Sequence, residues 1–379
     1  MGDAHQRQLK YARILREYQM VVRTLGGARR PVSQGPGFTV YPTASRGRAF
    51  FPIDALKLGS GLHRQAGFDL VSTEDPMLCG LVGFALRRRF GLALSAQIAG
   101  DMLDNPFWLR ERPINPALNV LGKWLILRAD SIRVVSERER AKIIALGARP
   151  DRVRNIGWIT DFARFEDVDG AAVRGHLLGG TRANYLLLFP GRLVPQKDLA
   201  TLLHGLAAIV HERADVCLAV AGDGPERARA ERLAAHLGLE RFVSFLGAVP
   251  YPELPRYFAA SDLVLLPSRY EGNARVLAEA AAAGRPVVTT DVSGARDTVL
   301  EGSTGCVVPV ERPDLVAERT LRLLADPNTL RQMGIRAREH IRHLYAEDRL
   351  LAAFAGLWMS TVGPHPLPPL PNLGEGVGG

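Results

Sequence analysis

The sequence predicts an α/β protein built from two doubly wound domains, each with a parallel sheet covered by helices on both faces. Three observations support this prediction. Short runs rich in Val, Leu and Ile alternate with longer segments of helical apolar spacing. The alternation occurs twice, before and after a polar stretch at residues 161–180. The chain of 379 residues is also long enough for two domains. Apolar strands alternating with helices are typical of parallel sheets buried on both faces.

The first alternating series occupies the first half of the chain. It opens with helical apolar spacing over residues 3–17, where Asp3 is the expected N-cap. Residues 26–67 are rich in Gly, Pro and Arg, show no clear period and receive no assignment. Strands are expected at 19–25, 68–72, 92–99, 131–136 and 153–159, and helices at 76–88, 116–127 and 137–146.

The second series has stronger apolar strands and follows the same order. Each strand is followed by a loop that contains Gly or Pro, and most of these loops lead into a helix. Strands are expected at 185–189, 216–221, 242–246, 263–266, 286–290 and 305–308. Helices are expected at 198–210, 225–237, 252–260, 314–324, 329–345 and 346–359, and in the segment that ends at Gly284.

These patterns divide the chain into an N-terminal domain over 1–165, a linker over 166–184 and a second domain over 185–336. Helices over 337–360 are expected to pack back toward the first domain. The Pro- and Gly-rich tail over 361–379 cannot build a core and is predicted to be disordered. In paired doubly wound domains, the site is expected in the cleft between them, at the carboxyl ends of the strands.

Composition favours a globular, cytoplasmic protein. Hydrophobic residues make up 47% and charged residues 23% of the chain. No apolar run reaches the length of about 18 residues that spans a bilayer, and no signal peptide is recognisable at the start. Cys79, Cys217 and Cys306 lack metal-ligand spacing and lie in apolar segments, so we expect buried free thiols and no metal site.

The positive charge is concentrated in the first half. Residues 1–180 hold 27 Lys and Arg against 17 Asp and Glu, and residues 181–379 hold 21 against 22. This basic half predicts an anionic partner, such as an anionic membrane surface or a phosphorylated acceptor. The Arg runs have no interleaved aromatic residues and no nucleic-acid-binding motif, so nucleic acid is not expected. A solvated Arg-rich surface would give the same composition.

Two carboxylates mark the most informative stretch. Glu271 lies in a loop after the strand at 263–266, and Glu279 lies eight positions later in the helix that follows. Eight helical residues rise about 12 Å. Gly272 and Asn273 lie between them, at a helix N-terminus, where backbone N–H groups favour an anion. A ligand with hydroxyls at both ends and phosphates between fits this pattern. The same pattern would arise if the first glutamate were only stabilised by the helix dipole at the N-terminus and the second were an ordinary surface residue.

Two further loops follow strands in the same domain. Gly191, Arg192 and Lys197 follow the strand at 185–189, and this pair of cations suits a diphosphate. Residues 222–225 (Gly-Asp-Gly-Pro) follow the strand at 216–221. They lack the dinucleotide fingerprint and a P-loop lysine, which argues against nicotinamide binding and ATP hydrolysis.

Together these motifs resemble the retaining glycosyltransferases of family four, which have the GT-B fold. Gly191, Arg192 and Lys197, then 222–225, then 245–247 (Phe-Leu-Gly), then Glu271 and Glu279 occur in the family's order and at its spacing. The resemblance covers roughly residues 2–360 and is most specific over 185–310. It implies two Rossmann-like domains that face each other across a cleft.

The resemblance also implies roles for these residues. Arg192 and Lys197 would hold the donor diphosphate and stabilise charge on the departing nucleotide. Glu271 would contact the donor sugar and Glu279 the ribose hydroxyls. The donor would be a UDP- or GDP-sugar, attacked from its front face by an acceptor hydroxyl. Fixed cations and a helix N-terminus would meet the leaving-group charge, so no metal or cofactor is expected.

The remaining donor contacts implied by the family come from loop backbone. Gly272 and Asn273 would offer amides to the phosphates. The base would lie near Leu246 and Gly247. Two further glycines at strand ends, Gly191 and Gly222, would also contact the donor.

The chain departs from the family pattern in three places. The family opens with a strand and a Gly-rich loop before its first helix, whereas Met1 falls at about the end of that loop. Either the start is misassigned, or the first parallel sheet lacks a central strand and is left open. Where many relatives carry a His facing the donor sugar, Ala99 or Gly100 stands here, with Asp101 as the remaining polar group. Asp101 joins the catalytic candidates, and His5 and Asp3 are candidates on the acceptor side. The family's Gly-Phe-Gly after the first Glu is Gly-Asn-Ala here.

Three functions remain open from the sequence. The first is a glycosyltransferase that acts on a glycan or lipid-linked acceptor in polysaccharide, glycan or glycolipid synthesis. The second is a catalytically impaired nucleotide-sugar binding protein. The third is a sugar-nucleotide epimerase of similar two-domain architecture. The basic first half also predicts peripheral attachment to the cytoplasmic face of an anionic membrane.

Overall fold

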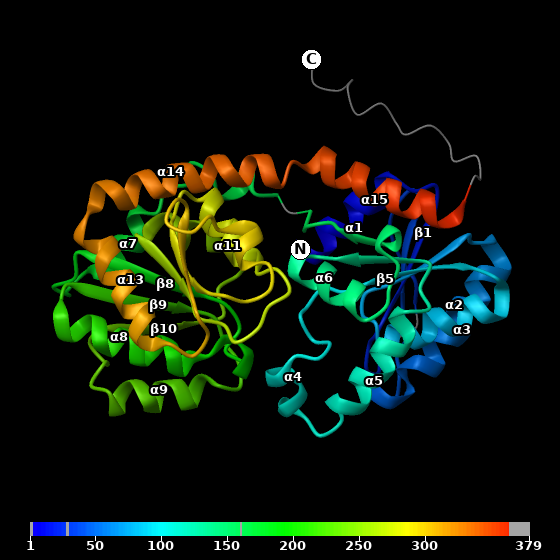
Figure 1. Ribbon diagram of the computed structural model, residues 1–379, viewed down its shortest axis with the longest axis horizontal. Helices are drawn as coiled ribbons and strands as arrows, with labels where there is room; N and C mark the ends of the chain where they lie inside the picture. The colour runs from blue at the N-terminus through cyan, green and yellow to red at the C-terminus, as the bar shows by residue number, and fades with distance from the viewer. Residues whose placement is uncertain (1–2, 28–29, 160, 364–379) are drawn as a thin grey trace, which may run out of the picture.

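The computed structural model describes residues 3–27, 30–159 and 161–363, and for residues 3 and 4 only the backbone. Its two halves lie side by side and each contains parallel strands with helices around them (Figure 1). In the described part of the chain, no helix is long and apolar enough to cross a membrane. Of the disordered tail predicted over 361–379, residues 361 and 362 are helical and residues 364–379 lie outside the described residues.

The second half is built on one 6-stranded, wholly parallel sheet in the order β10-β9-β8-β11-β12-β13. All the strands predicted from residue 185 onward are present. They are β8 (Tyr185–Pro190), β9 (Val216–Ala221), β10 (Val243–Gly247), β11 (Leu263–Leu266), β12 (Val287–Thr290) and β13 (Gly305–Val308).

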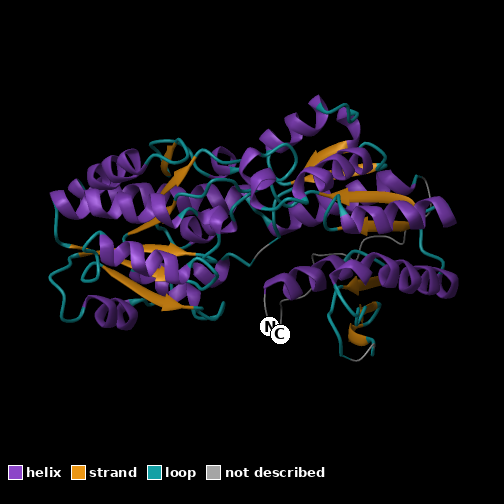
Figure 2. Ribbon diagram, turned by 90° about the horizontal axis from the view of Figure 1, so that it is seen from below, coloured by secondary structure: helices purple, strands orange, loops and turns teal. Residues whose placement is uncertain are grey.

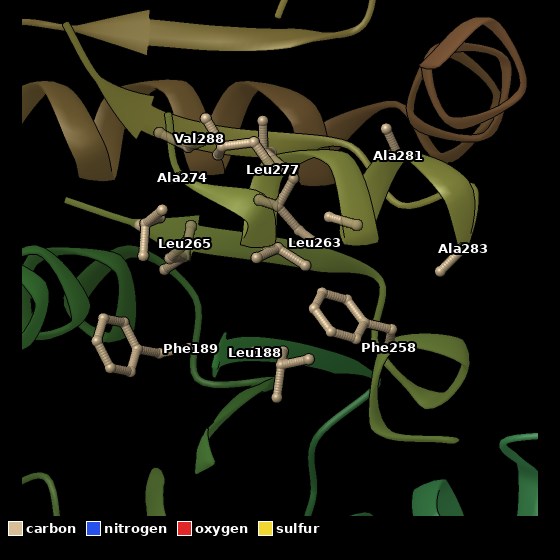
Figure 3. Packing of buried hydrophobic residues seen from close by; sticks show 14 of the residues in the cluster. Leu188, Phe189, Phe258, Leu263, Leu265, Ala274, Leu277, Ala281, Ala283 and Val288 are labelled. Atoms are coloured by element: carbon tan, nitrogen blue, oxygen red, sulfur yellow. The ribbon is translucent and has the colours of Figure 1, made fainter. Parts of the chain in front are cut away.

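Helices cover both faces of this sheet. The apolar strand residues are buried between them, and Figure 3 shows Leu188, Leu263 and Phe258 packed close together in this core. The helices are α8 (Leu199–Glu212), α9 (Arg227–His236), α10 (Leu254–Ala260), α11 (Arg275–Ala282), α12 (Ala295–Thr298) and α13 (Pro313–Ala325).

The first half contains two separate sheets. Four parallel strands form the order β4-β5-β6-β7, and three further strands form the order β1-β3-β2, in which β2 runs antiparallel to β3. Figure 2 shows the strands of this half in two groups. The strands are β1 (Tyr18–Val22), β2 (Val32–Gly35), β3 (Phe38–Pro42), β4 (Leu70–Thr73), β5 (Ala93–Gln97), β6 (Ser131–Val134) and β7 (Val153–Asn155).

In the described residues these two sheets are not joined, because β1 and β4 do not pair with each other. Residues 26–67, which received no assignment, contribute β2, β3 and a helix to this half. The short helix α4 was also not predicted. The helices are α1 (Asp3–Arg13), α2 (Phe51–Ala66), α3 (Leu78–Phe90), α4 (Pro106–Glu111), α5 (Asn115–Ile126) and α6 (Glu137–Ala145).

Two C-terminal helices connect the halves. α14 (Pro327–Leu344) lies along the second half, and α15 (Glu347–Val362) continues over the first (Figure 1). In α15, Phe354 packs on Tyr11 of α1 with 4.6 Å between ring centroids, and Trp358 packs on the same ring at 5.7 Å. Burial of these large rings fixes α15 against α1.

The polar segment predicted as a linker contains structure of its own. Residues 166–184 include α7 (Ala171–Leu178), which packs against α10. Arg174 donates to the Ala260 carbonyl at 2.8 Å and to Asp262 at 2.9 Å. This segment is therefore attached to the second half. Cys217 and Cys306 are buried free thiols, as predicted, whereas Cys79 is half-buried.

Candidate active site

The loops after β8, β9 and β10 meet at one edge of the second sheet. A Cβ atom added to Gly222 would lie 1.8 Å from the Gly191 carbonyl oxygen, so only glycine fits between these backbones. Gly222 also forms a β-bridge with Gly247. The Leu193 amide donates to the Asp223 carbonyl at 2.9 Å. The predicted donor-loop glycines are thus brought together, next to the half-buried Leu246.

Lys197 and Glu271 form a largely buried ion pair at this edge. The Lys197 Nζ lies 2.5 Å from Glu271 Oε1, and each side chain is only about one-tenth exposed. Two more donors hold the carboxylate, the Ser268 hydroxyl at 2.8 Å and the Gln196 amide at 3.2 Å. A carboxylate with this many donors is fixed in position. The sequence predicts both charged residues for the site but not their mutual contact, nor the roles of Ser268 and Gln196.

The backbone around Lys197 explains why that side chain points inward. A short 3₁₀ turn over Pro195–Lys197 ends at Asp198, which has a left-handed φ of 48°. The Asp198 carboxylate caps α8 by accepting from Thr201. Arg269 lies 3.3 Å from the same carboxylate. These contacts hold the loop that carries the lysine.

Arg192 differs from Lys197 in being exposed. It lies close enough to Tyr270 for its charge to lower the pKa of that phenol, although burial and Glu111 raise the pKa more. The Tyr270 hydroxyl donates to Glu111 Oε1 at 2.6 Å, which joins the loop between β11 and α11 to α4 of the first half. Arg192 therefore presents a solvent-accessible cation near the contact between the two halves.

Glu279 is the fifth residue of α11 and is buried. Its carboxylate accepts from the Tyr251 hydroxyl at 3.1 Å and lies 3.6 Å from the Arg275 guanidinium. Tyr251 follows β10, so the partner comes from a neighbouring strand end. Arg275 is one helical turn before the glutamate, a spacing that could have been read from the sequence. Tyr251 had no sequence signal.

Gly272 and Asn273 lie against the first half of the molecule. A Cβ atom on Gly272 would lie 2.6 Å from the Ala99 carbonyl oxygen, so the loop between β11 and α11 touches the segment that follows β5. The Asn273 side-chain amide donates to the Val135 carbonyl at 3.0 Å and to the Tyr345 hydroxyl at 2.9 Å. Trp158 donates to the Asn273 carbonyl at 3.0 Å. The asparagine side chain therefore joins the two halves.

The acceptor-side candidates are more dispersed. Asp101 forms an ion pair with Lys142 and accepts from Asn105 at 3.2 Å, so its carboxylate holds the loop after β5 onto α6. His5 is half-buried in the first turn of α1. α1 begins at Asp3, and the Asp3 side chain lies outside the described residues. Among the described side chains, no hydrogen bond or ion pair links His5 or Asp101 to Glu271.

A buried carboxylate lies behind Asp101. Burial, followed by repulsion from Asp101, raises the pKa of Glu139 to about 8. Its backbone amide donates to the Ser136 hydroxyl at 3.1 Å, which caps α6. Ser136 also lies 3.0 Å from Ser293 of the second half. The start of α6 is thus a second contact between the halves.

Comparison with known proteins identifies the family. A family model described as "Glycosyl transferases group 1" matches residues 181–340, and one described as "Glycosyl transferase 4-like domain" matches residues 5–157. D-inositol 3-phosphate glycosyltransferase of Thermomonospora curvata is 30% identical over 363 residues, which cover 90% of this chain and 84% of that protein. The chain belongs to glycosyltransferase family 4.

Solved structures agree on the fold of this family 4 glycosyltransferase. Sucrose-phosphate synthase of Thermosynechococcus elongatus superimposes with a TM-score of 0.79 at 23% identity, over 90% of this chain and 88% of that one. Anabaena HepE, in complex with UDP and glucose, superimposes with a TM-score of 0.76 at 20% identity, over 95% and 96%. The predicted GT-B fold is therefore confirmed, and family membership makes the protein a retaining glycosyltransferase.

Another relative shows how varied the named activities of the family are. Alpha-D-kanosaminyltransferase of Streptomyces kanamyceticus is 28% identical over 256 residues, which cover 66% of each protein. Among the described residues of this family 4 glycosyltransferase, no group of three or more His, Cys, Asp or Glu side chains could hold a metal ion.

Proposed function

We propose that this glycosyltransferase moves a sugar from a UDP- or GDP-sugar to a hydroxyl group of a glycan or lipid-linked acceptor. The observation that supports the proposal best is the Lys197–Glu271 ion pair at the strand edge, beside the exposed Arg192. The HepE structure with UDP and glucose supports a UDP-linked donor. The names of the inositol-phosphate relatives are consistent with a polyol acceptor.

The geometry suggests how the donor is held. A diphosphate placed between Arg192 and Lys197 would draw the lysine away from Glu271 and free that carboxylate for sugar hydroxyls. Glu279, with Tyr251 beside it, would accept from the ribose hydroxyls. The base would then lie near Leu246. Backbone amides of Gly272 and Asn273 would contact the phosphates just before the N-terminus of α11.

In the proposed reaction, the bond between the sugar C1 and the diphosphate oxygen breaks on the same face on which the acceptor oxygen bonds to C1. The acceptor proton passes to the departing diphosphate. The two cations stabilise the negative charge that builds up on this leaving group. Because they supply positive charge where it is needed, we propose that the transfer needs no metal ion or other cofactor.

The function is tested with UDP- and GDP-linked glucose, mannose and N-acetylglucosamine and a panel of polyol, oligosaccharide and lipid-linked acceptors. The proposal expects release of nucleoside diphosphate together with an α-linked product from an α-linked donor. Tight donor binding without turnover over the whole panel would favour a nucleotide-sugar binding protein instead. A changed sugar without a transfer product would indicate an epimerase.

We further propose that the enzyme works at the cytoplasmic face of an anionic membrane, on a surface formed by α3 and α5. Val120 and Trp124 of α5 are exposed one helical turn apart, and Leu127, which directly follows the helix, is exposed as well. Leu81 of α3 is also exposed. Trp124 packs edge-on against Phe84 and lies 3.9 Å below the Arg128 guanidinium. Ile114, which directly precedes α5, is exposed too. The name apolar stripe is used below for Leu81, Ile114, Val120, Trp124 and Leu127.

Arginines border the apolar stripe, as a surface that meets anionic lipid requires. Arg88 is exposed on α3, and the exposed Arg110 and Arg112 precede the start of α5. Apolar and aromatic side chains would enter the headgroup region while the guanidinium groups contact lipid phosphates. An anionic lipid surface would also bring a lipid-linked acceptor close to the cleft.

In flotation with liposomes that contain phosphatidylglycerol, we expect the protein to float with the liposomes at low salt. At 0.5 M salt most of the protein should no longer float, because the Debye length falls to about 4–5 Å and the attraction between arginine and lipid phosphate is screened. A Val120→Ser/Trp124→Ala variant is expected to float several-fold less. Ile335→Ser, which removes an exposed apolar residue of α14, is the matched control and should float like the wild type. Equal flotation of all three proteins, or recovery that is independent of salt, would contradict the membrane surface.

A further inference from the structure

In the described part of the chain, two segments pass from one half of the molecule to the other, and Tyr345 contacts both. The first crossing leads from β7 to the 3₁₀ turn Ala163–Phe165, which packs against α10 and α11 of the second half. The second crossing lies between α14 and α15 (Figure 1). Tyr345 is the residue at which α14 ends, so it begins this second crossing, and it is buried.

The Tyr345 ring packs directly on the first crossing. Its centroid lies 5.3 Å from the centroid of the Phe162 ring, a distance at which aromatic pairs attract. A Cβ atom on Gly157 would lie 2.7 Å from Tyr345 Cε1, so the ring lies against the bare backbone of that glycine. The two crossings are therefore in contact with each other through this one side chain.

The Tyr345 hydroxyl reaches the loop between β11 and α11. It lies 2.9 Å from Asn273 Nδ2 and 3.2 Å from Asn273 Oδ1, so the hydroxyl can accept from the amide and donate to its carbonyl oxygen. The same hydroxyl lies 3.3 Å from the Thr298 hydroxyl of α12. Burial raises the pKa of the phenol, so the group stays protonated at neutral pH and keeps its ability to donate.

Asn273 is also bound by the first half. Trp158, the neighbour of Gly157 in the first crossing, donates to the Asn273 carbonyl at 3.0 Å. The Asn273 side chain donates to the carbonyl of Val135, which follows β6, at 3.0 Å. Asn273 thus lies where both crossings meet the loop between β11 and α11. The phenylalanine of the family pattern at this position could make none of these side-chain hydrogen bonds.

We propose that Tyr345 is a positioning residue of the transfer reaction, which acts through Asn273 to hold the loop between β11 and α11 in a fixed position relative to both crossings. This role rests on the proposed donor site, in which the backbone amides of Gly272 and Asn273 contact the donor phosphates. Hydrogen bonds weaken steeply when their angle or distance is poor, so a displaced loop binds phosphate less well. By reciprocity, a nucleotide bound at the loop stabilises the two crossings.

Three variants and a control test this role. Tyr345→Phe keeps the ring and its packing and removes only the hydroxyl, so the variant is expected to fold. Asn273→Leu removes the other partner, and the double variant combines the two changes. Tyr257→Phe removes a half-buried hydroxyl from α10 and is the matched control. Hydrogen exchange, thermal unfolding and calorimetric titration with UDP and GDP are measured for all the proteins.

Without nucleotide, Tyr345→Phe is expected to speed amide exchange in the loop at 268–274 about three- to tenfold, while Tyr257→Phe exchanges like the wild type. In the Asn273→Leu background, Tyr345→Phe should add nothing further, because its contact with the loop is already lost. Unchanged exchange of the loop in Tyr345→Phe, or effects of the two substitutions that multiply, would overturn the proposal.

With nucleotide, whichever of UDP and GDP binds the wild type should slow exchange at residues 153–159 and 341–350. Tyr345→Phe should lose this protection and bind the nucleotide about three- to tenfold more weakly. A lower unfolding midpoint with unchanged affinity and protection would show a purely structural role and contradict the proposal. If neither nucleotide binds the wild type, the proposed donor site is wrong, and the exchange without nucleotide still decides whether Tyr345 holds the loop.

Discussion

Replacement of Lys197 by alanine is expected to lower kcat/KM for sugar transfer by about 10²–10³-fold, mainly through kcat, because one fixed charge on the leaving group is lost. The lysine is held at the strand edge by its loop and by Glu271, at 2.5 Å. A preorganised cation of this kind needs no rearrangement when charge develops on the diphosphate. The measurement is steady-state kinetics of nucleoside diphosphate release with a working donor and acceptor.

The control for this variant must separate lost catalysis from lost stability. Removal of Lys197 leaves the Glu271 carboxylate largely buried and unpaired, which destabilises the fold. A Lys197→Ala/Glu271→Gln double variant removes that penalty, so it should recover thermal stability without recovering activity. Lys57→Ala on the exposed face of α2 is the matched substitution and should behave like the wild type. Activity of the Lys197 variant within twofold of the wild type would show that the lysine does not face the diphosphate.

The second large effect is expected at Glu279. Substitution by alanine removes a charged acceptor for the ribose hydroxyls, and hydrogen bonds to charged groups contribute about 1.5–3 kcal/mol each. KM for the donor should therefore rise about 10–100-fold while kcat changes little, because these contacts exist before and during the reaction. Initial rates over a range of donor concentrations provide the measurement.

Two side chains contact the Glu279 carboxylate, so the control must separate the loss of these contacts from the loss of donor binding. Tyr251 and Arg275 contact its carboxylate. Tyr251→Phe removes one of these contacts and should raise donor KM by a smaller factor than Glu279→Ala. Glu318→Ala on the exposed face of α13 should leave donor KM unchanged. A large fall in kcat at an unchanged KM would contradict a ribose-binding role for Glu279.

The second half of the fold could be predicted almost completely from the sequence. Its strands are continuous apolar runs such as 263–266, and glycine-containing loops separate several of them from the helices that follow. Local patterns of this kind report burial on both faces directly. Loops that follow parallel strands lie together at the carboxyl ends of these strands. This rule also predicts that Lys197 and Glu271 lie close to each other.

Contacts between distant segments could not be predicted in the same way. The partners in the Lys197–Glu271 pair are 74 positions apart, and those in the Asn273–Tyr345 hydrogen bond are 72 apart. Neither pair has a local spacing signal, because only the tertiary fold brings the partners together. The basic, Gly-rich residues 26–67 also conceal a strand pair and a helix, since their strands are only partly buried and lack clear alternation.

Binding of a nucleoside diphosphate tests the central claim most directly, because it needs no knowledge of the sugar or the acceptor. UDP and GDP are titrated calorimetrically into the wild type, an Arg192→Ala/Lys197→Ala variant and an Arg331→Ala control. We expect one molecule of one of the two nucleotides to bind per chain. Its affinity should fall by about 100-fold or more in the double variant, which corresponds to about tenfold for each cation, and remain unchanged in the control. Equal affinity in all three proteins, or no binding of either nucleotide to the wild type, would contradict the donor site described here.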